Sequence, residues 1–473
     1  MHRKIFKLLP INHNLLAIII YYRLTALAFA DTYSLETLNL ALMANNPDIR
    51  AAEEEYNRSV LDYKDALASI GPKIDLQISG TYMVNPPVGS LYVNADDIIN
   101  SVQWPGGISP SKTGQYIKIY DGMENTLYSF GLTLEQPVFT WGKIYNARKL
   151  YKEISNVQEL KLENTRTKYK TELETRIVTL SYLYNIKTIL QEEKIYADEI
   201  VTFSEEAETN GMLLHQDVVE AKIKAKELDI AEQGVDEQIT SQLLELQRIT
   251  GIQDLTFEEI DYEYDESEKY YNNDEEIRDS FLDAALSGNQ ITIKMVNKTK
   301  EINDIATKIA KDSVYWKPDI GFQASANYGG SRVPFVEKNW TRKNDYTLNL
   351  SLGITTTVWD GGKKLNDIAR SKSNAESAEI NADAARATIR KTLLEQFNTV
   401  DVCSMKIEYQ DLKIETAESK IKQQETLYES GYGSKPDLLS AKIEKCNAQI
   451  EKTQAELQRS VAALTIRFLT DGE

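Results

Sequence analysis

The sequence predicts a mixed fold that combines a membrane β-barrel with a barrel of long α-helices. Three observations lead to this prediction. The chain contains a duplicated unit, because residues 211–221 match residues 431–441 at an offset of 220 residues. Each copy holds two short segments in which apolar and polar residues alternate. Each copy also holds one long stretch without Pro or Gly, at 143–209 and at 364–430, which is typical of a long helix.

The duplication also locates an insertion. Upstream of the matching motif, residues 72–79 resemble 318–325 at an offset of 246 residues, so the first copy carries 246 − 220 = 26 extra residues between about 83 and 126. An insertion of this kind predicts an exposed loop over 84–125. We expect it to face outside the cell, where it could fold over a pore or serve as a receptor or antigenic surface.

Four segments follow from the repeat and the composition. They are an export signal at 1–30, a first repeat at 31–253, an acidic linker at 254–276 and a second repeat at 277–473. Each repeat is expected to run helix, strand, loop, strand and long helical hairpin. The acidic stretch extends to about residue 279 and is interpreted as a solvated linker, with an adaptor-binding or cation-binding belt as the alternative.

The N-terminus has the pattern of a cleaved export signal. Arg3, Lys4 and Lys7 precede an apolar core at 15–20, and Ala28-Phe29-Ala30 forms an A-x-A cleavage site. The alternative is a retained membrane anchor, but the apolar core is too short to span a bilayer as a stable helix. No later apolar run is long enough for a transmembrane helix.

Composition excludes several classes of function. The chain of 473 residues carries a net charge of −18, which disfavours nucleic acid as a partner. After the signal only one histidine remains, His215, so a histidine-based metal site or catalytic triad within one chain is not expected. If a hairpin turns near Gly433, Cys403 and Cys446 lie about 25 Å apart, beyond disulfide reach, so we expect two buried small side chains. No phosphate-binding or dinucleotide motif is present, and the prediction is a protein with no cofactor and no enzymatic activity.

The alternating segments are predicted to be half-buried strands. Each is about ten residues long, which is the length that crosses an outer membrane when the strand is tilted. The opposite face carries small polar residues, as expected for a water-filled lumen. The alternative is a soluble sheet packed on a core. The apolar positions of the four strands are Ile74, Leu76 and Ile78; Tyr128, Phe130, Leu132 and Leu134; Ile320, Phe322, Ala324 and Ala326; and Tyr346, Leu348, Leu350, Leu352 and Ile354.

The remaining sequence is predicted to form long antiparallel coiled-coil helices, because apolar residues recur at heptad-like spacing among many charged ones. Four strands cannot close a barrel, and an open sheet edge cannot lie in lipid, so other chains must complete it. Three copies would give twelve strands, an even number in the allowed range. The expected helices cover 34–68, 143–209, 214–249, 277–313, 364–430 and 436–468.

These features together resemble the TolC-type outer-membrane efflux protein family over nearly the whole mature chain. The resemblance is carried by the two Gly-x5-Asp-[LV]-[LV]-x-Ala motifs at 211–221 and 431–441, by Trp141-Gly142-Lys143, by the segment 359–363 (WDGGK) and by 38–47 (LNLALMANNP). It implies a homotrimer whose outer-membrane β-barrel continues into a periplasmic tunnel of α-helices. It also implies a periplasmic adaptor (membrane fusion) protein and an inner-membrane pump or ABC exporter as partners. The chain would then be a passive, gated exit duct of a tripartite efflux or type I secretion system.

The resemblance assigns roles to the ends of the two helical hairpins, where adaptors are expected to bind, at 209–217 and 429–437. The residues implied in docking are Gly211, Met212, His215, Gly431, Tyr432, Gly433 and Lys435. The residues implied in a periplasmic gate are Asp437, Ser440, Asp217 and Glu220. Ser440 departs from family members that carry a second Asp there. The alternative for Asp437 is a carboxylate near a helix N-terminus, and for His215 it is a plain exposed side chain rather than a pH sensor.

Two rival classes remain. A periplasmic coiled-coil structural or adhesive protein without a channel explains the helices but not four strands of membrane length. A porin-like uptake channel explains the strands but not hairpins of roughly 100 Å.

Overall fold

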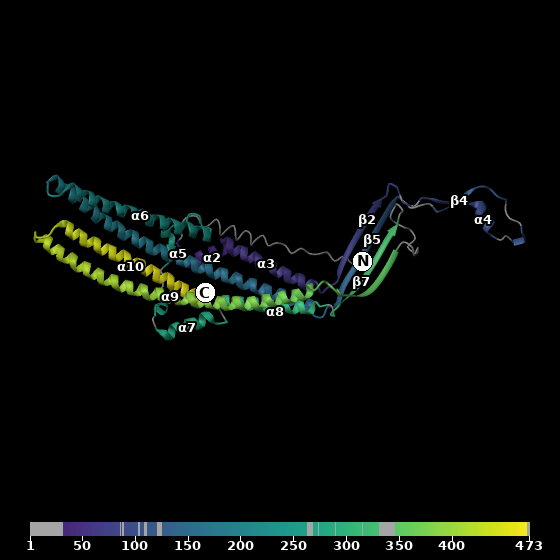
Figure 1. Cartoon of the computed structure of the whole chain (residues 1–473). Helices are drawn as coiled ribbons and strands as arrows, with labels where there is room; N and C mark the ends of the chain where they lie inside the picture. The colour runs from purple at the N-terminus through teal and green to yellow at the C-terminus, as the bar shows by residue number, and fades with distance from the viewer. Residues whose placement is uncertain are drawn as a thin grey trace, which may run out of the picture. The chain divides into compact units, whose positions relative to one another are not determined.

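The computed structural model describes residues 32–85, 87, 89–102, 105–107, 111–120, 125–262, 268–272, 274–288, 290–314, 316–330 and 346–470 (Figure 1). The expected export signal lies outside these residues. The described residues form two compact units, one within the ranges 1–57, 156–299 and 379–473, and the other within 58–155 and 300–378. We call them the helical unit and the sheet unit. Each therefore draws on both halves of the duplication, whose boundaries stay a prediction.

The sheet unit contains a four-stranded antiparallel sheet in the order β2-β5-β7-β8. Its strands are β2 (Lys73–Tyr82), β5 (Thr126–Phe139), β7 (Asp319–Gly330) and β8 (Tyr346–Thr355). All four predicted strands are confirmed. The register places Leu76 opposite Leu132, Leu132 opposite Ala326, and Ala326 opposite Leu348. Because side chains alternate along a strand, this register gathers the predicted apolar residues on one face of the sheet.

The segment 84–125 is more than the loop that the sequence predicted. It contains a two-stranded sheet, in which β3 (Leu91–Asn94) pairs with β4 (Tyr116–Tyr120). It also contains a helix, α4 (Ala95–Ser101), and a short 3-10 helix, η1 (Pro105–Gly107). The carboxylate of Asp96 accepts the backbone N–H groups of Thr113 (2.7 Å) and Gly114 (3.0 Å). Strands this short give too few alternating positions to be seen in the sequence.

Four long helices form a layer in the helical unit, in the order α6, α5, α10, α9 (Figure 1). They are α5 (Lys143–Thr209), α6 (His215–Thr250), α9 (Lys363–Glu429) and α10 (Lys435–Thr470). Their bounds lie within two residues of the predicted ones. Helices α5 and α6 form one antiparallel hairpin, and α9 and α10 form the other. Ion pairs join the two helices of each hairpin along its length. These include Lys187–Asp236 (2.7 Å), Lys194–Asp229 (2.5 Å), Lys420–Glu444 (2.7 Å) and Lys452–Asp411 (2.7 Å).

Two expected helices are each split in two, which corrects the prediction. The segment 34–68 forms α2 (Leu35–Asn45) and α3 (Pro47–Ala68), and 277–313 forms α7 (Glu275–Leu286) and α8 (Ile291–Asp312). The first break follows from Asn46, which is fully buried and accepts the N–H groups of Asp48 (2.9 Å) and Ile49 (3.0 Å). Its cap starts a new helix at Pro47, whose missing N–H is harmless in a first turn.

Asn45 and Asn46 also satisfy the end of another helix. Asn45 Nδ2 donates to the carbonyl of Thr250 (2.9 Å) and Asn46 Nδ2 to that of Ile249 (3.4 Å), at the C-terminus of α6. Such carbonyls have no partner within their own helix. The Asn-Asn-Pro segment thus joins the end of α2 and the start of α3 to the C-terminus of α6 by hydrogen bonds.

The helical unit has two separate apolar cores, one from each repeat. Leu42, Leu173 and Leu246 belong to the first core, and Leu393 and Ile466 to the second. The acidic linker is anchored to both, because Leu255 is buried in the first core and Tyr270 in the second. Among the described residues of the linker, Asp254, Glu258, Asp261 and Asp274 are exposed, whereas these two apolar residues are buried.

Both cysteines are free and buried, as predicted. Burial raises the pKa of Cys446 to about 12, so its side chain stays a neutral thiol. Within the described ranges, no helix combines the length and apolar content needed to cross a membrane. No group of His, Cys, Asp and Glu side chains in that same part of the chain is arranged to hold a metal ion.

Candidate functional site

The first hairpin turns at Gly211, where the helix α5 ends. Gly211 has φ +74°, a left-handed conformation that favours glycine. Its N–H donates to the carbonyl of Glu208 (2.8 Å), and the N–H of Met212 donates to that of Ala207 (2.8 Å). This pair of bonds is a Schellman motif, which satisfies the last carbonyls of the helix and reverses the chain.

The second hairpin repeats this turn at Gly431, with φ +76°. Its N–H donates to Tyr428 (3.0 Å), and the N–H groups of Tyr432 and Gly433 both donate to Leu427 (2.9 Å each). Gly433 has no left-handed conformation. Instead it packs closely, because a Cβ atom there would lie 2.8 Å from the backbone nitrogen of Tyr428. The sequence predicted both Gly431 and Gly433 as turn residues. Glycine is needed at Gly431 because of the left-handed backbone and at Gly433 because of the close packing.

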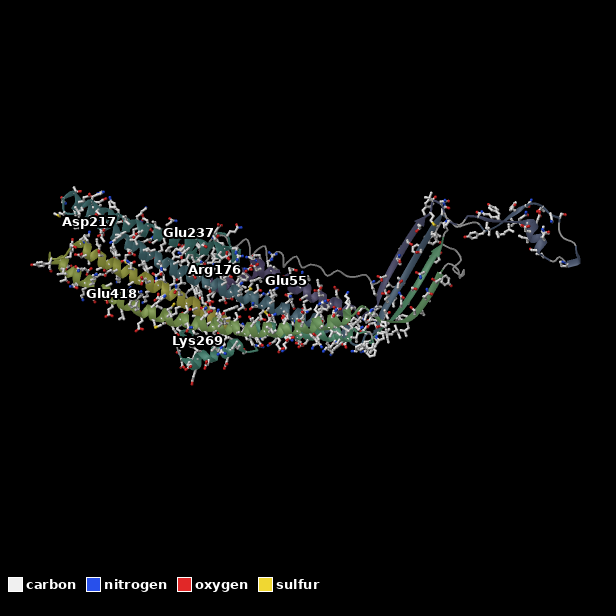
Figure 2. The ribbon with its side chains drawn as sticks, viewed as in Figure 1. Glu55, Arg176, Asp217, Glu237, Lys269 and Glu418 are labelled. Carbon is white, nitrogen blue, oxygen red and sulfur yellow. The ribbon has the colours of Figure 1, made fainter. Side chains whose placement is uncertain are left out.

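The predicted gate carboxylates lie in the first turns of α6 and α10. Asp217 accepts the N–H of Leu214 (3.0 Å). Asp437 accepts the hydroxyl of Ser434 (2.5 Å), whose oxygen in turn accepts the N–H of Asp437 (3.3 Å). Both carboxylates are exposed near the end of their hairpin, and Figure 2 shows this for Asp217. Both carboxylates therefore bond to groups at a helix N-terminus, which is the alternative expected for Asp437.

The other predicted residues fall into place around these turns. Glu220 and Ser440 are exposed one turn further along α6 and α10. Met212 and Tyr432 stand at the two turns with side chains 78% and 87% exposed. His215 is exposed and its Nδ1 lies 2.9 Å from Glu208 Oε1. Within the described chain, none of the four gate residues is hydrogen-bonded to a residue of the other hairpin.

Sequence reasoning missed a seam that joins the two hairpins where α5 packs against α10. Lys435 Nζ, the one predicted tip residue in it, lies 3.0 Å from Glu199 Oε2. Further along, Lys442 Nζ lies 5.3 Å from the ring centroid of Tyr196, and Asn447 Nδ2 donates to Glu193 (3.0 Å). The seam continues through Tyr182 with Ser460 and Glu174 with Arg467. These partners are more than 200 residues apart, and nothing in either segment alone points to the other.

Glu193 is the unusual member of this seam. Its side chain is only 3% exposed, and its second carboxylate oxygen has no hydrogen-bond partner within the described chain. Burial raises the pKa of Glu193, and the bond from Asn447 lowers it in part. The carboxylate form is therefore disfavoured where the two hairpins meet.

The apolar face of the sheet has the pattern of a surface in contact with lipid. Large aliphatic side chains on it are exposed, among them Leu76, Leu350 and Leu352. Aromatic residues flank this band at both ends, as expected at the two interfaces of a membrane. One group is Tyr82, Tyr128, Phe130, Tyr328 and Tyr346, and the other is Phe139, Trp141, Trp316 and Trp359.

Trp141, in the second of these aromatic groups, also has an unusual backbone conformation. It is the non-glycine residue with positive φ (+54°) among those described, and its Nε1 donates to the carbonyl of Pro318 (2.8 Å). At the matching position the second repeat has Gly361, with φ +70°. A left-handed turn is thus common to both repeats, and the first accepts the strain of a tryptophan there.

The comparisons with known proteins agree with this geometry. The sequence matches the family described as outer membrane efflux protein over 38–252 and 306–472. In fold it is similar to the outer membrane protein VceC from Vibrio cholerae, with a TM-score of 0.68 at 15% identity, covering 92% of this chain and 96% of that one. The Campylobacter jejuni CmeC outer membrane channel gives a TM-score of 0.69 at 14% identity over 93% and 85% of the two chains. No curated protein matches the sequence.

The fold is that of these outer-membrane proteins. The chain belongs to the outer membrane efflux protein family. As a member it is an efflux channel of the outer membrane with a large periplasmic portion, and it is not an enzyme.

Proposed function

We propose that three copies of this chain form the outer-membrane exit duct of a tripartite efflux or type I secretion system. The observation that carries the proposal is the sheet, which has one exposed apolar face and two open edges. Among the described strands, β2 and β8 each pair with a single neighbour. Unpaired backbone groups cannot remain in lipid, so the edges must pair with those of other copies. Three sheets of four strands close a barrel of twelve.

The helical layer supports the same assembly, because its two outer helices, α6 and α9, each leave apolar side chains exposed in one chain. Exposed apolar side chains lie on α6, such as Ile223 and Ile230, and on α9, such as Met405 and Leu412. Scattered apolar residues on the surface are normal, but rows of them on both edge helices favour contact with further helices. Copies placed side by side would cover α6 of one with α9 of the next and close a tunnel.

The hairpin ends would form the periplasmic entrance of that tunnel. There Asp437, with Ser440, Asp217 and Glu220, would form the gate, and rings of carboxylates at a narrow entrance favour cations and repel one another. The exposed turns, including Met212, Tyr432 and His215, would contact a periplasmic adaptor protein, and the adaptor would connect the duct to an inner-membrane pump or ABC exporter. A coiled-coil structural protein without a channel leaves the apolar face of the sheet unexplained.

Single-channel recording tests the proposal. The native oligomer is extracted in detergent and inserted in a planar bilayer, with Asp437→Ala beside the wild type. We expect a small conductance that rises in the variant, because alanine is smaller than aspartate and leaves the entrance wider at all three copies. Channels of unchanged conductance would retain the duct and reject Asp437 as the gate. A folded oligomer that never conducts would reject the duct.

A further inference from the structure

The polar face of the sheet is divided into an uncharged part and a charged end. The described residues of the four long strands include only four charged side chains, Lys73, Asp75, Glu135 and Asp319. The register places all four at the end where β2 and β7 begin and β5 ends. The rest of that face carries small or neutral polar residues such as Ser79, Ser129, Ser325, Asn327 and Asn349.

Two of the acidic residues at this end are neutralised by direct ion pairs. Lys73 Nζ lies 2.7 Å from Asp75 Oδ2 on the same strand. Lys143, at the start of α5, places its Nζ 2.9 Å and 3.0 Å from the two carboxylate oxygens of Asp319. Each lysine is thus held by one carboxylate.

Glu135 is left as the net charge of this group. It stands directly opposite Lys73 in the ladder and attracts its ammonium group only weakly, because that group is ion-paired with Asp75, so three carboxylates face two lysines. On its other side Glu135 accepts a hydrogen bond from the amide of Gln323 (3.2 Å), a neutral donor. The carboxylate of Glu135 is exposed, so it can act on whatever passes along this face.

The same end is hollowed. A hollow of about 870 Å³ is lined by Lys73, Glu135, Lys143, Asp319 and Gln323 together with apolar residues such as Phe322. Charged groups in a concave wall concentrate the field more than charges on a flat surface do. Ions and cargo that cross the barrel would therefore meet the carboxylate of Glu135 inside a recess.

We infer that this charged end is a charge filter of the duct, and that Glu135 makes it favour cationic over anionic cargo. The inference rests on the proposed function, because a filter needs a lumen, and it adds a second selective point apart from the hairpin ends. Three copies would supply three such carboxylates around the base of the barrel. The uncharged remainder of the polar face would let cargo slide without further selection.

The test is the reversal potential of the assembled oligomer under a KCl gradient. In Glu135→Gln the side chain keeps its shape and its hydrogen-bonding ability but loses its charge. We expect the ratio of K⁺ to Cl⁻ permeability to fall about twofold near 0.1 M salt. The effect should shrink near 1 M, because the screening length falls from about 10 Å to about 3 Å. Glu135→Asp should retain the wild-type ratio.

The control is Glu275→Gln, which removes an exposed carboxylate from α7 in the helical unit. All variants are also measured in the Asp437→Ala background, so that the entrance does not mask the barrel. A permeability ratio unchanged in Glu135→Gln, or an equal fall in Glu275→Gln, would overturn the filter while leaving the duct intact. Absence of conductance in the wild type would instead overturn the duct itself.

Discussion

At the scale of the residue, the hairpin ends show how few side chains a tight reversal needs. Gly211 and Gly431 are required by a left-handed backbone, and Gly433 by the closeness of the preceding helical turn. The first repeat has Leu213 where the second has Gly433. The second hairpin end is thus packed more tightly around its own backbone, next to the predicted gate residue Asp437.

This difference predicts that Gly433→Ala loosens the second hairpin end. The added Cβ would lie 2.8 Å from the nitrogen of Tyr428 and 3.0 Å from the carbonyl carbon of Leu427, which are backbone atoms that cannot move freely. Hydrogen exchange of the amides in 427–437 should therefore become faster. Gly234→Ala is the matched control, because a Cβ there meets open space in the middle of α6. Replacing that glycine should stabilise the helix by about 0.5–1 kcal/mol. Unchanged exchange at 427–437 in Gly433→Ala would show that the close packing is not needed.

At the scale of the element, the seam between α5 and α10 decides how firmly the two hairpins hold together. Most of its contacts are polar and half-exposed, and such pairs each contribute little. Glu193 differs because it is buried and only partly hydrogen-bonded. A buried acid with a raised pKa holds its proton more tightly in the folded state than in the unfolded state. Its contribution to stability is therefore greatest at low pH, and it is lost as the pH rises from about 4.5 to the raised value.

This sign predicts the effect of Glu193→Gln. The amide retains the neutral form at every pH, so the variant should melt at a higher temperature than the wild type at pH 7 to 8. The difference should vanish near pH 4, where the wild-type carboxyl is protonated in both states. Glu237→Gln, at an exposed position of α6, serves as the control and should show no such trend (Figure 2). A Glu193 variant that is less stable than the wild type at neutral pH would mean that the carboxylate form is favoured in the seam.

At the scale of the whole molecule, the duplication was the most informative feature of the sequence. Local periodicity predicted the four strands and the long helices, and glycines predicted the two turns. The duplication showed that these patterns occur once in each repeat. The break at Asn46 was missed since its cause is a buried side chain that also bonds the end of α6. The α5–α10 seam and the charged end of the sheet could not be predicted from segments alone. Both depend on the register between strands or helices that are far apart in the chain, such as β2 with β5 and Glu193 with Asn447.

The roles of the predicted site residues depend on assembly, which no single chain displays. The central claim is that the open edges of β2 and β8 are closed by other copies of the same chain. An electron cryo-microscopy reconstruction of the oligomer in a lipid nanodisc tests it most directly. We expect three copies, a closed barrel of twelve strands, and β8 of each copy paired with β2 of the next. A folded particle in lipid whose β2 and β8 edges remain unpaired, or whose copies meet only through the helices, would contradict the account.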